Sequence, residues 1–123
     1  MESILTSIKK MLGIAEEYEH FDTDLIMHIN SVLFILTQLG VGPSSGFSIE
    51  DKTSVWSDFV PAGINLEAVK SFTYLKVRLL FDPPQSSAVM ESIKQLINEL
   101  EWRINIEVDP LKSVGEEETQ NGK

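Results

Sequence analysis

The sequence predicts a mainly α-helical fold: a small four-helix domain with a long inter-helix loop and a flexible C-terminal tail. Three observations support this fold class. Apolar residues recur at helical spacing in four segments. Glycine or proline residues separate these segments, and residues 115–123 contain no apolar side chain. The 123 residues, of which 42% are apolar, are enough for one domain with a core of its own.

The first expected helix covers about residues 3–12. Its apolar residues fall three, four and seven positions apart and therefore share one helix face. They are Ile4, Leu5, Ile8, Met11 and Leu12. Gly13 is expected to end the helix in the left-handed conformation, and an acidic connector without lysine or arginine follows over residues 16–24.

The second expected helix, residues 22–39, has the strongest pattern in the chain. Asp22 is a suitable N-cap, and Phe21 is placed to pack against Ile26 across the first turn. Apolar side chains cover nearly the whole circumference, which is typical of a central helix or of a helix whose second face is covered by a partner. Gly40 ends the helix.

The segment from residue 41 to residue 63 is expected to be a long loop. Residues 47–49 favour a short strand or an extended arm, and residues 55–60 favour a single helical turn. Loops of about 20 residues inside a small domain are usually functional or disordered, and the aromatic side chains here argue against disorder. Together with the broad apolar face of the second helix, the loop is a candidate subunit interface, although a place in the core is the alternative for each side chain. The candidate interface residues are Phe47, Ile49, Val55, Trp56 and Phe59.

The third expected helix starts at Asn65, a favoured N-cap. Val69, Phe72 and Leu75 lie on its apolar stripe. The sequence Asp82-Pro83-Pro84 ends it, because proline lacks the backbone donor and restricts the residue before it.

The fourth expected helix begins near Ser86 or Ser87 and keeps its apolar period as far as Asn105. Beyond Asp109 the apolar content falls, and ordering such a segment costs more entropy than its contacts can offset. We therefore expect a helical domain over residues 1–109 and a flexible acidic tail over residues 110–123.

Composition and charge exclude several classes of protein. The chain has no cysteine, which rules out a disulfide framework, a thiol nucleophile and a cysteine zinc site. Its net charge of −9 makes it a poor candidate for wrapping nucleic acid, because that affinity comes mainly from lysine and arginine. The longest apolar run, residues 32–36, is far below the roughly 20 residues of a membrane span, and the N-terminal residues lack the order of a secretory signal.

No motif with the spacing of a catalytic site is present. His20, Asp24 and His28 follow one another at four-residue steps, and such a set can bind a metal in principle; a pair of histidines beside an acidic connector is the favoured interpretation. The connector lacks the ordered ligands and central glycine of a calcium loop. The sequence therefore predicts no enzyme, no catalytic residue, no cofactor and no metal ion.

Several stretches combine packing and turn residues in a more specific way. They are SILTSIKKMLGI, FDTDLIMHINSVLFILTQLGVGP, SVWSDF, VKSFTYLKVRLLFDPPQSSAV and IKQLINELEWRINI. In these stretches the chain resembles the head–tail connector (adaptor) proteins of tailed bacteriophages and prophages of Gram-positive bacteria. The similarity covers about residues 3–106. None of its residues is catalytic, so the resemblance concerns fold and structural role.

The resemblance implies a virion protein at the head–tail interface, assembled in the host cytoplasm. Such proteins form a ring, of dodecamer type, on the portal protein, extend the DNA channel and dock stopper or tail-completion proteins. DNA would pass through without sequence-specific binding, and no membrane would be involved. The loop 41–63 and the segment after Ile106 would be the contact regions. The alternative function is a small acidic regulatory or partner-binding module, whose partner would bind residues 16–24.

Overall fold

The computed structural model describes the backbone of residues 2–121 and the side chains of residues 2–108. Within that part the chain forms five helices and no β-strand, and one isolated antiparallel bridge joins Ser3 to Val55. The helices are α1 (Ile4–Met11), α2 (Asp22–Leu39), α3 (Trp56–Phe59), α4 (Leu66–Phe81) and α5 (Ser87–Asn121). The mainly α-helical fold class is confirmed, and the additional helix α3 is the single turn expected within residues 55–60.

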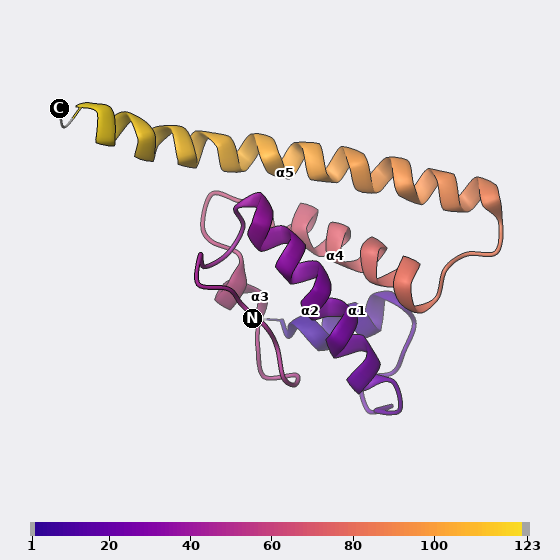
Figure 1. The fold of residues 1–123 in the computed structure, drawn as a ribbon. Helices are drawn as coiled ribbons and strands as arrows, with labels where there is room; N and C mark the ends of the chain where they lie inside the picture. Colours follow the sequence, from indigo (N-terminus) through magenta and orange to yellow (C-terminus); the bar gives the residue numbers. More distant parts are fainter. Residues whose placement is uncertain (1, 122–123) are drawn as a thin grey trace.

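The central helix of the fold is α4. It packs against α2 on one side and α5 on the other, and α1 contacts both α2 and α4 (Figure 1). Of all the residues of α4, only Glu67 and Leu80 are exposed. Val69, Phe72 and Val77 are fully buried, as expected of a helix that has neighbours on several faces.

The central position of α4 decides between the two interpretations of the second helix. The inner face of α2 is fully buried through Leu25, Ile29 and Leu36. On its opposite face Met27 and Phe34 are 59% and 61% exposed. α2 is therefore a flanking helix whose second face, uncharged and with two large apolar side chains, is exposed to solvent.

The ends of α1 follow the local sequence signals. The Ser3 side chain accepts a hydrogen bond of 3.2 Å from the backbone N–H of Thr6, which makes it the N-cap. Gly13 has a φ of +80°, and the N–H of Ile14 donates to the carbonyl of Lys9 at 2.8 Å. This left-handed closure, which favours glycine, turns the acidic connector back along α1.

Asp22 does not cap α2, contrary to the expectation from the sequence. The N-cap position is Phe21, which makes no capping bond, and Asp22 is the first residue of the helix. The Asp22 carboxylate pairs with Lys9 Nζ at 2.8 Å, and the ring of Phe21 packs against that of Phe81 with centroids 5.2 Å apart. Contacts from distant parts of the chain thus replace the predicted local cap.

The other two long helices begin as expected. The Asn65 side chain accepts a 3.0 Å hydrogen bond from the N–H of Ala68 and caps α4. α5 continues to Asn121, beyond the expected end at Asn105. Ile104 and Val108, one helical turn apart, are both buried and extend the core-facing stripe past that point. The side chains of residues 110–123 lie outside the described part of the chain, and the flexibility expected of this tail stays a prediction.

Candidate functional site

The predicted interface residues of the long loop make contacts with the core of their own chain. Trp56 is fully buried, and its indole N–H donates a 2.7 Å hydrogen bond to the Ser7 hydroxyl in α1. Beside it the N–H of Ile4 donates to the carbonyl of Ser54 at 3.0 Å. The segment that leads into α3 is therefore docked on the N-terminal end of α1.

A second anchor joins the loop to α2 and to α3. The Asn30 side chain accepts from the N–H of Ile49 at 2.7 Å and donates to its carbonyl at 3.0 Å. Both backbone groups of this buried residue are thereby satisfied. The rings of Phe47 and Phe59 pack with centroids 5.2 Å apart. A Cβ at Gly42 would lie 2.5 Å from Cε1 of Phe59, so this close approach requires glycine.

Burial divides the five predicted interface residues into two groups. Ile49, Trp56 and Phe59 are buried in the core, whereas Phe47 and Val55 are partly buried. The sequence correctly indicated that these side chains need burial, and the structure supplies it from α1 and α2. A contact of any of the five with a second molecule stays a prediction.

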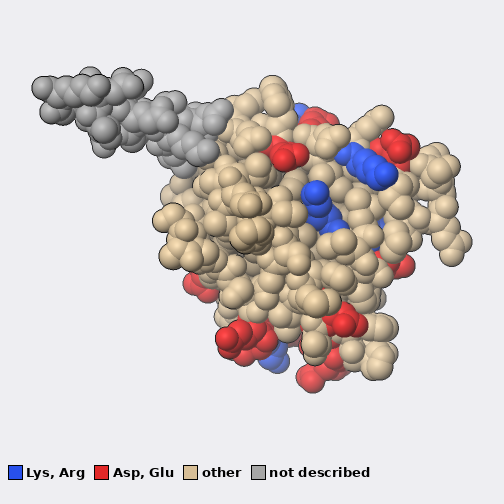
Figure 2. All heavy atoms as spheres, in the orientation of Figure 1, with Lys and Arg blue, Asp and Glu red and all other residues tan. Residues whose placement is uncertain are grey.

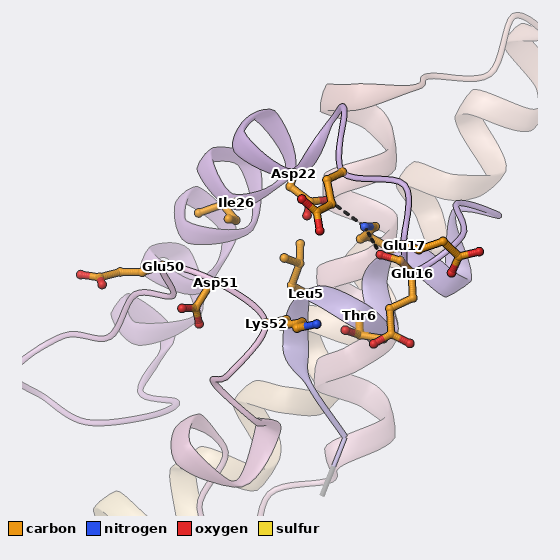
Figure 3. A pocket seen from close by; sticks show the side chains of 11 residues that line it. Leu5, Thr6, Glu16, Glu17, Asp22, Ile26, Glu50, Asp51 and Lys52 are labelled. Atoms are coloured by element: carbon orange, nitrogen blue, oxygen red, sulfur yellow. Dashed lines mark hydrogen bonds and ion pairs between the residues drawn. The ribbon is translucent and has the colours of Figure 1, made fainter.

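An acidic pocket of about 500 Å³ lies where the α1–α2 connector meets residues 50–52 (Figure 3). Its charged lining consists of six carboxylates and two lysines. They are Glu16, Glu17, Glu19, Asp22, Glu50, Asp51, Lys9 and Lys52. Hydrogen bonds from the side chain and backbone of Thr53 lower the pKa of the Asp51 carboxyl, which favours its ionised form.

Lys9 holds the connector in place beside this pocket. Its side chain is 2% exposed, and Nζ donates to the carbonyls of Glu16 and Tyr18 at 2.8 and 2.7 Å. Nζ also lies 2.8 Å from Oδ1 of Asp22. The two connector carbonyls use two of the three ammonium donors, and the Asp22 carboxylate is the ion-pair partner of the same group. Lys9 is thus a structural clamp.

The two histidines make aromatic contacts. The His20 ring packs edge-on against Phe21, with centroids 4.8 Å apart, and the His28 ring lies 6.5 Å from that of Phe81. Among the described residues no group of three or more His, Asp or Glu side chains is arranged to hold a metal ion. No helix in the same part of the chain has the length and apolar content needed to cross a membrane.

One exposed surface is the outer stripe of α2, formed by residues that share the face opposite the core. They are Met27, Ser31, Phe34 and Gln38. Between residues 25 and 39 the chain has no Asp, Glu, Lys or Arg. Figure 2 shows acidic groups at the lower edge and at the upper right of this face, with a largely uncharged area between them; α2 crosses this area in Figure 1.

A groove of about 600 Å³ between α4 and α5 forms the other exposed surface. Leu96, Trp102 and Ile106 are 45%, 63% and 45% exposed and line it along α5. The sequence analysis did not identify this groove. The available signal was that Trp102 and Ile106 fall outside the helical stripe that contains the buried residues of α5.

A comparison with known families finds a match over most of the chain. A family described as "Phage connector protein" matches residues 4–110, which include α1 to α4 and all described side chains of α5 up to Val108. No curated protein and no solved structure gives a significant match. The narrower likeness to phages of Gram-positive bacteria stays a prediction. Because the family match spans most of the chain, this protein belongs to the phage connector protein family.

Proposed function

We propose that this protein is a structural component of the virion that forms a ring beneath the portal and joins the head to the tail. The observation that carries the proposal is the match to the phage connector family over residues 4–110. In this role the ring extends the DNA channel and provides a docking surface for stopper or tail-completion proteins. Its subunits are made in the host cytoplasm and end up at the head–tail interface.

The charge of the chain supports a channel through which DNA passes freely. With a net charge of −9, each subunit repels the phosphate backbone. Binding to duplex DNA depends mainly on lysine and arginine that replace counterions. A ring of acidic subunits therefore gives a wall without sequence-specific binding, and the proposal assigns no catalysis and no cofactor to it.

The long loop is one proposed region of contact with the portal. Because Ile49, Trp56 and Phe59 are used inside the subunit, the contact is assigned to exposed parts of the same loop, residues 43–46 and 50–53. These short exposed segments have fixed ends, since the anchors beside them are bonded to α1 and α2. A docking surface with fixed ends loses little entropy on binding.

The mass of the purified protein tests this function, measured by light scattering or native mass spectrometry, alone and with portal rings from the same genome. We expect stoichiometric capture by the portal, with or without a ring of the isolated protein. A parallel titration with duplex DNA at physiological salt should show no binding. A monomer that ignores the portal would contradict the proposal and favour the acidic partner-binding module, with the acidic pocket as its binding surface.

A further inference from the structure

We propose that the outer stripe of α2 in one subunit docks into the α4–α5 groove of a second copy of this chain, which joins the subunits head to tail. The inference rests on the proposed ring and identifies the two surfaces that form its repeating contact. It assigns a role to the two exposed apolar surfaces that the fold leaves without a partner inside the subunit.

The outer stripe has the chemistry of a covered surface. A helix that is apolar nearly all round is normally central or covered on its second face, and the central position belongs to α4. Met27 and Phe34 stand one and a half to two turns apart on the exposed side, and no charged residue lies between residues 25 and 39. Because charged residues make up 24% of the chain, a helix face without any is unusual for permanent contact with water.

The groove combines apolar side chains, Leu96, Leu100, Trp102 and Ile106 among them, with three carboxylates and one arginine. Glu99 lies 2.8 Å from Arg103 on the same helix. The Glu107 carboxylate accepts a hydrogen bond from the backbone N–H of Asn65 at the start of α4. Glu67 lies 3.9 Å from Lys70 Nζ. The carboxylates outnumber the arginine, so the groove disfavours an acidic insert, whereas an uncharged, apolar insert such as Phe34 meets its apolar side chains without adding negative charge.

The positions of the two surfaces favour a second copy in a head-to-tail arrangement. The stripe lies on α2, and the groove lies between α4 and α5, so the two surfaces share no residue; α2 and α5 are separate neighbours of α4 (Figure 1). A contact between two different surfaces is heterologous, and it closes into a ring when the rotation permits. Subunits of charge −9 repel one another in general, so a contact in which one of the two surfaces is the uncharged stripe keeps this repulsion low.

A complementation experiment tests the pairing with two single variants, Phe34→Asp and Trp102→Asp. Each places a charge in one half of the contact and leaves the other half intact, and both positions are exposed, so folding should be preserved in circular dichroism. In sedimentation equilibrium each variant alone should self-associate at least about tenfold more weakly than the wild type, because burying an unpaired charge is costly. The mixture should form a heterodimer, since Trp102→Asp retains the stripe and Phe34→Asp retains the groove. Homodimers of either variant, or a mixture that stays as weak as its components, would overturn the inference.

If the isolated chain is monomeric, cross-linking tests the contact instead. The chain has no cysteine, so each introduced cysteine is the only thiol in its variant. Single variants Phe34→Cys and Trp102→Cys are mixed under mild oxidation, alone and on portal rings, with Lys10→Cys plus Trp102→Cys as the matched control pair; Lys10 is exposed and lies outside the stripe, the groove and the proposed portal contact. The inference expects the Phe34–Trp102 disulfide to form several times faster than the control disulfide. Equal rates would overturn it. If the portal captures the protein while no selective cross-link forms, the proposed function stands and only this assignment of surfaces fails.

Discussion

Replacing Lys9 by methionine tests whether the buried clamp stabilises the fold. Methionine fills a similar volume but leaves the Asp22 carboxylate without its cation and the carbonyls of Glu16 and Tyr18 without their donor. Breaking a buried ion pair by removing one partner costs about 3–5 kcal/mol. Since the Asp22 side chain is 25% exposed, water restores part of its solvation, and the connector carbonyls can rehydrate. We therefore expect Lys9→Met to lower the free energy of unfolding by about 2–4 kcal/mol.

Urea denaturation followed by tryptophan fluorescence measures this loss. Trp56 is fully buried, whereas Trp102 is 63% exposed, so a Trp102→Phe background isolates the signal of the buried indole. The matched control is Asp22→Asn, which keeps the two carbonyl bonds of Lys9 and should cost only about 1–2 kcal/mol. The double variant should lose less than the sum of the two, because the ion pair is then removed once. A loss below about 0.5 kcal/mol for Lys9→Met would refute the view that the clamp stabilises the subunit.

Three further predictions concern the loop and the exposed surfaces. Trp56→Ala should lower the free energy of unfolding by about 3–5 kcal/mol, because it leaves a cavity in the core. Trp56→Phe should lower it by about 1–2 kcal/mol, because it removes the hydrogen bond to α1. Equal, small losses for both variants in urea titration would contradict the burial of Trp56. Gly42→Ala should be more destabilising than Gly46→Ala, because both have positive φ but only a Cβ at Gly42 meets a ring; melting temperatures check the order. Phe34→Ala and Trp102→Ala should leave stability within about 0.5 kcal/mol of the wild type, and a larger loss in thermal melts would show that these side chains support the fold.

Features governed by neighbouring residues could be predicted from the sequence. Asn65 caps α4 and Gly13 closes α1, as expected, because each acts on backbone groups within three or four residues. The same local reasoning was wrong at Asp22. A suitable cap residue there pairs instead with Lys9, thirteen positions earlier, and no pattern within the helix reports that partner.

The surroundings of the long loop depend on contacts over much greater sequence separations. Burial of its aromatic residues was predictable from their chemistry, but the partner of Trp56 is Ser7, 49 residues away. For the same reason the sequence left open whether the second helix is central, since α2 is the more apolar helix although α4 has more neighbours. The exposed groove beside Trp102 depends on how α4 and α5 pack, and periodicity along one helix does not report that packing.

The distribution of charge links the subunit to the proposed ring. The acidic residues of the connector and of residues 50–52 gather at one edge of the molecule, around the acidic pocket (Figure 2). The α2 stripe carries no such charge, and the carboxylates of the groove have partners in their own chain. If the stripe and the groove form the junction between subunits, the acidic edges of successive subunits lie beside the junctions and align in the ring. Salt screens their mutual repulsion, which extends over about 8–10 Å at physiological ionic strength. Ring formation by the isolated protein should therefore become stronger as the salt concentration rises. A junction held by ion pairs would instead become weaker.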